Sequence, residues 1–417
     1  MPSLVRALLQ QNPADFCTIL AHRHDGIAKL PIPGRRKFWV VSDPASLHEI
    51  LVTKADTFDK GGPLYRTIAR ALGGEGLFTV NDRALWGRLH SLMYPSLRRY
   101  KLDPVTTLAA TLWQERMETW ETVQPIALFE EAKKFNMQLL AVYLFGLEVD
   151  STQLVELASQ VFAGMAGRIF LPTWLPGGAK YVRAINAFMA EIDRIIAIKR
   201  KMLSSETLLD ALFEATPSLT EKQLRDQVVT LLMAGHDSTA TVFSWALIRL
   251  SERPSQYNRL RQIALATKDS SWNDQTEFQE IERWIRAAAH DHPAFPLFFR
   301  NVTKTIVLKD KEMRAGDQII VTPYATHHDT RYWQGFDDFL IQSKEQPTID
   351  QRLAHLPFGK GVRKCIGEDF AMRIAVVMLS ELLRRFSSIT RPSPHSGEKI
   401  RYAMTAPPRD GALMWLK

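Results

Sequence analysis

Residues 357–371 read Pro-Phe-Gly-Lys-Gly-Val-Arg-Lys-Cys-Ile-Gly-Glu-Asp-Phe-Ala and place Cys365 in a glycine-rich turn. The chain after Gly367 has helical periodicity, so the cysteine stands just before a predicted helix N-terminus, which stabilises a thiolate. The glycines let backbone N–H groups approach the sulfur, as a metal-bound thiolate requires. Arg363 can reach an anionic group beside a metal. The pattern indicates one thiolate that binds one iron axially.

A second polar feature interrupts a long apolar helix, predicted from residue 220 to residue 252. Thr220 and Gln223 form a capping-box pattern at its start, and Pro254 disfavours helix beyond its end. Its centre reads Ala-Gly-His-Asp-Ser-Thr over residues 234–239. Glycine, serine, threonine and a buried carboxylate are all unfavourable there, which indicates a functional site. A packing kink at a helix crossing, with its polar groups satisfied, is the alternative.

These two segments together resemble the cytochrome P450 superfamily, the haem-thiolate monooxygenases. Residues 358–367 match Phe-x-x-Gly-x-Arg-x-Cys-x-Gly, the haem-binding loop of that family. Residues 234–239 resemble its oxygen-activation motif. Trp86 and His90 resemble the early helix that holds a haem propionate, and residues 328–333 resemble the segment before the family's meander. The resemblance covers most of the chain.

The resemblance implies haem b as cofactor, with Cys365 as the axial iron ligand. Asp237 and Ser238 are then expected to relay protons to iron-bound dioxygen, with Thr239 beside them. The other residues expected to contact haem are Trp86, His90, Ala234, Gly235, Arg300, Phe358, Gly359, Arg363 and Gly367. The expected substrate contacts are Phe78, Ala234, Ala294, Phe295 and Thr405.

Helical periodicity dominates the chain, and strand-like segments are few. We expect a mainly α fold with small β-sheets, and the absence of a linker or composition shift favours a single domain over residues 1–417. Residues 306–308 and 318–321 look like the two strands of a hairpin. Residues 326–357 look irregular, and such long loops are usually functional or disordered. The resemblance implies the cytochrome P450 fold.

Composition narrows the class of protein further. Among 417 residues there are only two cysteines, which excludes a disulfide framework and suits a reducing compartment. The net charge of +8 contains no block of five or more like charges, so it argues only weakly for nucleic acid and fits docking of an acidic protein. The start of the chain resembles neither a signal peptide nor a membrane anchor, so we expect a cytoplasmic protein. We also expect a monomer.

The chain departs from the family in three places. Serine at 238 stands where threonine is usual. Registered on Pro293, the family's Glu-x-x-Arg becomes Ala287 and His290, whereas Glu280 and Arg283 spell the motif seven residues too early. Residues 340–344 lack the meander arginine that completes the family's buried ion network. Joint loss of all members fits a rebuilt network. A haem protein with a looser proximal side, or an inactive relative, is the alternative.

We therefore expect a monooxygenase that inserts one oxygen atom from O2 into a lipophilic small molecule, such as a terpenoid, fatty acyl or polyketide intermediate. An acidic ferredoxin- or flavodoxin-type partner would supply electrons. Two alternatives remain. One is a peroxide-driven peroxygenase, which the intact pair of Asp237 and Ser238 disfavours. The other is a haem-binding relative without turnover, which the changes at Ala287 and His290 leave open.

The two cysteines make the ligand assignment testable. We expect Cys365→Ala to abolish the red-shifted Soret band that a thiolate gives to the reduced carbon monoxide complex, because Cys365 is the residue expected to supply the thiolate. Cys17→Ala is the matched control and should keep the band. A band that survives in Cys365→Ala would contradict the assignment.

Overall fold

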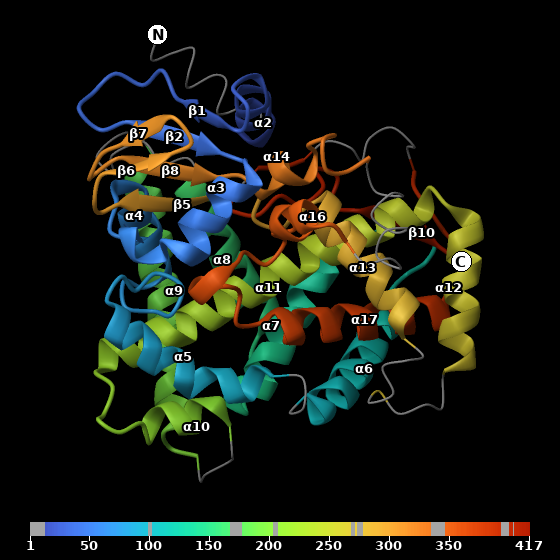
Figure 1. The fold of residues 1–417 in the computed structure, drawn as a ribbon. Coiled ribbons are helices and arrows are strands. Elements are labelled where there is room, and N and C mark those ends of the chain that lie inside the picture. The colour runs from blue at the N-terminus through green and yellow to red at the C-terminus, as the bar shows by residue number, and fades with distance from the viewer. Residues whose placement is uncertain are drawn as a thin grey trace. The chain divides into compact units, whose positions relative to one another are not determined.

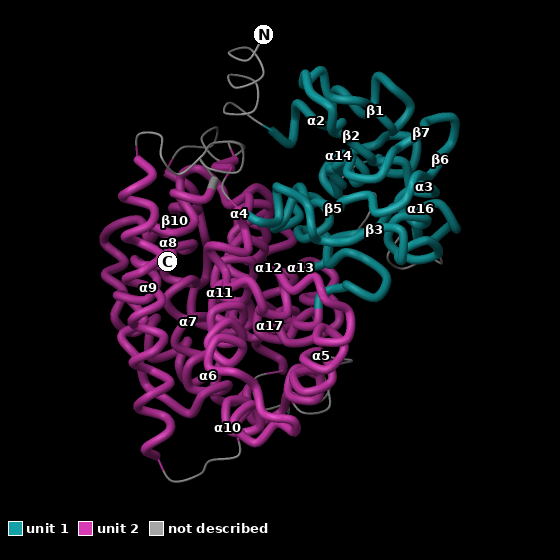
Figure 2. The backbone as a smooth tube through the Cα atoms, turned by 90° about the vertical axis from the view of Figure 1, so that its left-hand side faces the viewer, with its two compact units in different colours: residues 1–66, 286–365 teal, residues 67–285, 366–417 magenta. Residues whose placement is uncertain are grey.

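The computed structural model describes residues 13–98, 102–166, 177–202, 207–267, 272, 278–334, 347–392, 400–402 and 404–417. These residues belong to two compact units, coloured separately in Figure 2. The first unit comprises Met1–Arg66 and Arg286–Cys365, and the second comprises Thr67–Ile285 and Ile366–Lys417. The prediction of one domain over residues 1–417 stays a prediction.

The first unit contains a five-stranded sheet in the order β1, β2, β8, β5, β3. The strands are β1 (Ile27–Lys29), β2 (Phe38–Val41), β8 (Gln318–Val321), β5 (Phe298–Val302) and β3 (Phe58–Asp59). Strands β2 and β8 pair in parallel, and the other pairs are antiparallel. Every residue of β8 is buried, as befits an interior strand.

The predicted hairpin of residues 306–308 with 318–321 is wrong. Strand β6 (Ile306–Leu308) pairs instead with β7 (Lys311–Met313). Lys309 adopts a φ of 51°, so a two-residue turn closes this hairpin early. Strand β8 is then free to join β2 and β5.

Short helices complete the first unit: α2 (Pro13–Arg23), α3 (Pro44–His48), α14 (Pro323–His327) and α16 (Ile349–Ala354). The π-helix Glu49–Thr53 and the 3-10 helices Ala55–Thr57 and Gly361–Arg363 accompany them. The expectation that residues 326–357 are irregular is partly wrong, because Thr348 and Gln351 form a capping box that starts α16. Residues 335–346, which include most of the expected meander, lie outside the described residues.

Helices make up most of the second unit (Figure 1). They are α4 (Pro63–Leu72), α5 (Arg83–Leu97), α6 (Asp103–Glu118), α7 (Leu128–Phe145), α8 (Ser151–Ala166), α9 (Gly178–Lys199), α10 (Leu208–Phe213), α11 (Glu221–Ser251), α12 (Pro254–Ala266), α13 (Gln279–Asp291) and α17 (Glu368–Arg385). The first residues of α4 and the last of α13 belong to the first unit. A small sheet joins β4 (Ile126–Ala127), β10 (Leu413–Leu416) and β9 (Ile389–Thr390).

Helix α11 packs against α7, α9, α12 and α17 in the second unit. The predicted capping box of Thr220 and Gln223 is present at its start. Trp113 of α6 joins this core, with its ring against Phe135 and Phe243 and its indole N–H donated to the Met378 carbonyl at 3.1 Å. The prediction of a mainly α fold with small β-sheets is confirmed.

The register of α13 on Pro293 agrees with burial. Ala287 is 0% exposed and His290 is 2% exposed. Glu280 instead accepts two hydrogen bonds from the exposed Arg259 guanidinium, at 2.8 and 2.9 Å. The literal Glu-x-x-Arg match therefore contributes its glutamate to a surface ion pair.

This register predicts the effect of a carboxylate at position 287. Ala287→Glu should lower the free energy of unfolding by about 3 kcal/mol or more, because it buries an unpaired charge. Gln279→Glu is the control, since Gln279 is exposed in the first turn of the same helix, where an acidic residue is favourable. Equal effects of the two substitutions in thermal unfolding would contradict the register.

Candidate active site

The Cys365 loop depends on two glycines in the first unit. Gly359 and Gly361 have φ angles of +70° and +69°, which side chains rarely adopt. A Cβ on Gly361 would also overlap the Leu51 carbonyl oxygen of the π-helix. The Cys365 backbone N–H closes the loop by donating to the Phe358 carbonyl at 2.9 Å. These constraints present an exposed Cys365 side chain.

The two cysteines differ in burial. Cys17 is completely buried in α2, and burial raises the pKa of its thiol to about 12. It is therefore a core thiol that stays protonated. Cys365 is exposed and belongs to the loop that leads to α17, which begins at Glu368.

Three cationic side chains gather near the loop, within the first unit. Arg300 on β5 and Lys60 after β3 are each 8% exposed, and Arg363 lies in the 3-10 turn of the loop. Burial, together with repulsion by Arg300 and Arg363, holds the pKa of Lys60 well below its usual range. The Lys60 ammonium also lies 5.1 Å from the ring centre of Tyr65, and Arg300 bonds the Tyr65 hydroxyl.

Gathered like charges are stabilised when an anion binds among them. The carboxylates of the haem propionates have the chemistry that this cluster selects, so the residues fit the group. The sequence predicts Arg300 and Arg363 here but misses Lys60 and Tyr65. Lys60 stands between a strand and Gly61, and the sequence alone does not distinguish it from a surface lysine.

In the second unit, Ala234, Gly235 and Ser238 form a half-exposed face in the middle of α11, and the residues around them are buried. Ser238 donates its hydroxyl to the Ala234 carbonyl at 2.7 Å, and Thr241 donates to the Asp237 carbonyl at 2.8 Å. Such bonds to the preceding turn bend a helix slightly. The face therefore combines small side chains with a hydroxyl.

Asp237 is 6% exposed and accepts a hydrogen bond from the Thr405 hydroxyl. Thr405 comes from the C-terminal segment and is itself buried. The sequence predicts Thr405 as a substrate contact, and the structure shows that its hydroxyl bonds the acid of α11. Thr239 is buried on the same helix.

His236, between these residues, belongs to the core. It is 0% exposed, its Nδ1 lies 2.8 Å from the Leu232 carbonyl and its ring stacks on Phe162. Burial lowers its pKa, so it stays neutral. His236 therefore contributes to the packing of the core.

The remaining predicted contacts are divided between the units. Trp86 and His90 lie on one face of α5, with ring centres 4.9 Å apart. Phe78 directly follows Leu77, whose backbone N–H donates a hydrogen bond to the side-chain oxygen of Gln227 on α11 at 2.8 Å. Phe78, Ala234 and Thr405 belong to the second unit, and Ala294 and Phe295 to the first. That these residues share one pocket stays a prediction.

The family model for cytochrome P450 matches residues 2–409, and the chain belongs to this family. Carotene epsilon-monooxygenase of Arabidopsis thaliana is 24% identical over 404 residues, which cover 85% of this chain and 73% of the plant protein. Cyclooctatin synthase of Streptomyces melanosporofaciens is 25% identical over 418 residues, covering 94% and 88%. Putative cytochrome P450 137 of Mycobacterium tuberculosis is 24% identical over 415 residues, covering 94% and 83%.

Family membership defines the enzyme class. The protein is a cytochrome P450 monooxygenase, an oxidoreductase that uses haem, O2, a redox partner and a small-molecule substrate. Among the helices that the structure describes, none combines the length and the apolar character needed to cross a bilayer.

The cation cluster predicts a role for Lys60 in haem retention. Lys60→Gln should speed haem loss to a haem acceptor about tenfold or more, because a hydrogen bond to a charged group contributes about 1.5–3 kcal/mol. Lys54→Gln, at a half-exposed lysine of the same unit, is the control. Equal rates of haem loss in the two variants would remove Lys60 from the haem site.

Proposed function

We propose that the protein is a haem b monooxygenase in which Cys365 is the axial ligand and Asp237 with Ser238 controls proton delivery to dioxygen. One observation carries this proposal: α11 retains a buried acid beside a hydroxyl on a half-exposed face. A carrier has no use for a costly buried carboxylate at this point. A peroxide-driven enzyme needs it less, because peroxide brings both its electrons and its protons.

The chain's own groups perform the proton steps. Ser238 donates its hydroxyl hydrogen to the Ala234 carbonyl, so its oxygen lone pairs remain available to accept from a water molecule. Asp237 holds or releases a proton at its carboxylate, and the Thr405 hydroxyl orients that carboxylate. Haem held by Cys365 would supply the oxygen-activating chemistry, with the thiolate as electron donor. Arg300, Arg363 and Lys60 orient the propionates, and Trp86 and His90 are assigned to the same task.

The substrate is proposed to be a lipophilic small molecule, such as a terpenoid, fatty acyl or polyketide intermediate. The residues assigned to contact it are mostly apolar: Phe78, Ala234, Ala294 and Phe295. Carotene, in the name of one relative, is a lipophilic substrate of this kind.

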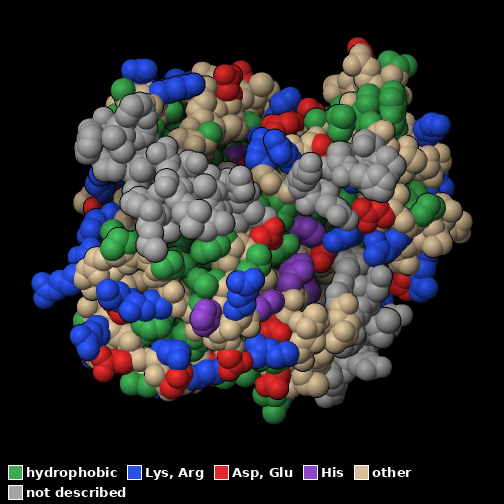
Figure 3. Space-filling model, turned by 90° about the horizontal axis from the view of Figure 1, so that it is seen from above, with side chains coloured by type: hydrophobic (Ala, Val, Ile, Leu, Met, Phe, Trp, Pro, Cys, Tyr) green, Lys and Arg blue, Asp and Glu red, His purple; other side chains and the backbone are tan. Residues whose placement is uncertain are grey.

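An acidic ferredoxin or flavodoxin type of protein is proposed as the electron donor. The net charge of +8 supports this partner. Around the Cys365 loop, Arg352 and Lys364 are exposed, and Val362 is 62% exposed. Elsewhere charges of both signs are interspersed, as on the face that Figure 3 shows. We further propose a cytoplasmic monomer.

Turnover assays separate the three candidate functions. Product formation with a reductant and ferredoxin, detected by mass spectrometry after a ligand-binding spectral screen, supports the monooxygenase. Product with hydrogen peroxide alone supports the peroxygenase. Haem and ligand binding without product from either source supports the carrier.

Asp237 can be tested against a matched acid on the same helix. Asp237→Asn should keep haem and ligand binding but slow turnover by about 10²–10⁴, the usual contribution of positioned proton transfer. The control is Asp226→Asn, because Asp226 is buried in α11 and bonds the Glu75 N–H at 2.9 Å. That control should lower stability while leaving turnover per haem unchanged. Unchanged turnover in Asp237→Asn would refute the proton-delivery role.

A further inference from the structure

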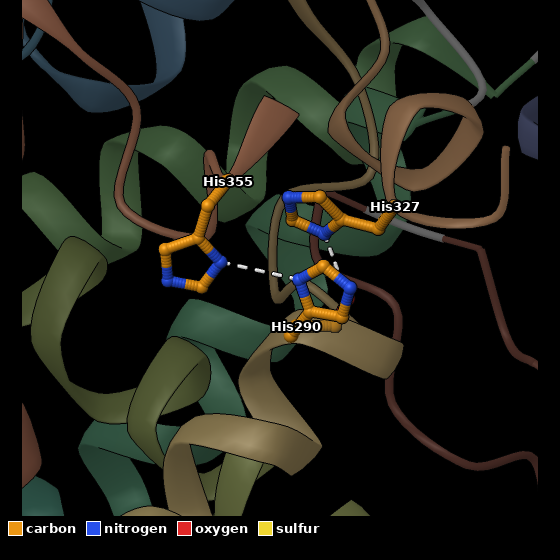
Figure 4. Close-up of side chains that lie close together, drawn as sticks. All are labelled: His290, His327 and His355. Atoms are coloured by element: carbon orange, nitrogen blue, oxygen red, sulfur yellow. Dashed lines mark hydrogen bonds between the residues drawn. The ribbon is translucent and has the colours of Figure 1, made fainter. Parts of the chain in front are cut away.

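Three histidines from three segments meet in the first unit, as Figure 4 shows. His290 is the last but one residue of α13, His327 ends α14 and His355 follows α16. Their ring centres lie 4.2 to 5.9 Å apart. The edge of the Trp333 ring meets His290 at 4.5 Å between centres. We call His290, His327 and His355 the histidine network.

His327 joins two backbone segments through its two ring nitrogens. Its Nδ1 lies 2.7 Å from the His290 carbonyl oxygen, and the Leu356 N–H donates to its Nε2 at 2.9 Å. A carbonyl can only accept and an N–H can only donate, so Nδ1 carries the hydrogen and Nε2 is bare. The ring is therefore held in one neutral tautomer. Leu356 directly precedes Pro357, the first residue of the Cys365 loop.

His290 and His355 form the second link. Their Nδ1 atoms lie 3.1 Å apart, a distance that requires one N–H donor and one bare acceptor. Protonation of both rings would place two N–H groups against each other. This link therefore needs at least one of the two rings to be a neutral imidazole.

Burial, with added repulsion from neighbouring groups, maintains this neutrality. His290 and His327 are 2% and 3% exposed, and burial holds the pKa of each well below its usual range against an opposing contribution from Asp291. His328 adds repulsion to both. Burial lowers the pKa of His355 to about 3, with additional repulsion from Arg286, Lys360 and Lys364.

A metal ion is the other occupant to consider, since each histidine offers one nitrogen and the three atoms lie within 4.8 Å of one another. The rings of His290 and His327 are stacked, with planes only 23° apart and centres 4.2 Å apart. Lone pairs lie in the ring plane, so stacked rings cannot direct theirs at one ion. The Nε2 lone pair of His327 is also used by Leu356. The geometry favours hydrogen bonds over coordination.

We propose that the histidine network replaces the buried ion network of the family and positions the Cys365 loop, by joining the end of α13 to Leu356 through His327. His290, His327 and His355 are positioning residues. This inference rests on the proposed role of Cys365 as haem ligand. It explains why the chain has Ala287 and His290 where the family has glutamate and arginine, because neutral imidazoles need no counter-ion.

A neutral network has a pH signature that an ion network lacks. The unfolded chain protonates histidine below about pH 6.5, whereas the folded network resists protonation until much lower pH. Unfolding therefore takes up protons in this window, and stability falls as pH falls. Each neutral histidine contributes up to about tenfold per pH unit to the fall of the folding equilibrium constant.

The test compares His327→Gln with His327→Leu in the haem-loaded protein. Glutamine keeps one donor and one acceptor but does not titrate, and leucine keeps neither. Two readouts are needed between about pH 5 and 8: the pH dependence of urea unfolding, and the red-shifted Soret band of the reduced carbon monoxide complex. His24→Leu, at an exposed histidine of the same unit, is the control.

We expect both His327 variants to flatten the pH dependence of unfolding by up to about tenfold per pH unit relative to His24→Leu. Leucine should diminish the thiolate band, and glutamine should largely restore it. A wild-type band and a wild-type pH dependence in His327→Leu would overturn the proposal. So would one equivalent of zinc that survives chelator dialysis in the wild type and is lost in His327→Leu.

The two proposals fail in different ways. If Cys365→Ala keeps the thiolate band, the assignment of the ligand falls, whereas the pH dependence of unfolding still reports on the histidine network. If only the pH dependence is unaffected by His327→Gln, the network proposal falls and the thiolate assignment stands.

Discussion

Helix α11 buries the carboxylate of Asp237 in its middle, which is energetically unfavourable. Other parts of the second unit compensate for this burial. An unpaired buried carboxylate is strongly unfavourable, so Asp237 needs a hydrogen-bond partner. The Thr405 hydroxyl supplies the bond from the C-terminal segment, 168 residues further along the chain. The 31-residue helix is in turn enclosed by α7, α9, α12 and α17. The polar site around Asp237 is therefore held by closely packed apolar helices.

The first unit contains two clusters of polar groups with opposite electrostatic properties. Lys60, Arg300 and Arg363 are gathered with like charges, an arrangement that favours an anionic ligand. His290, His327 and His355 instead satisfy one another and the backbone as neutral rings, which needs no ligand. The cluster of like charges is therefore a candidate anion-binding site, and the hydrogen-bonded histidines are candidate positioning residues. Both lie on segments that contact or lead into the Cys365 loop.

Local signals account for what could be predicted. The capping boxes, the glycine turn and the helical periodicity each act within a few residues, so α11, α17 and the cysteine loop follow from the sequence. The register of α13 follows from the spacing of Pro293 and Arg300. The pairing of β8 does not, because a short strand that is buried throughout fits several partners and only the sheet as a whole selects β2 and β5. Helix α16 does not follow from the sequence either, because its short capping signal lies in a polar segment.

The sequence by itself determined the family, the fold class, the candidate ligand Cys365 and the acid–hydroxyl pair on α11, because each depends on residues adjacent in the chain or spaced along one helix. Only the tertiary structure decided which distant groups meet them. Lys60 joins Arg300, Thr405 bonds Asp237, and His327 and His355 complete the network that His290 begins. These residues are separated by tens to hundreds of positions along the chain, and only the fold brings them together. Most buried polar groups pair with groups that lie near them in space, a condition that no local pattern records.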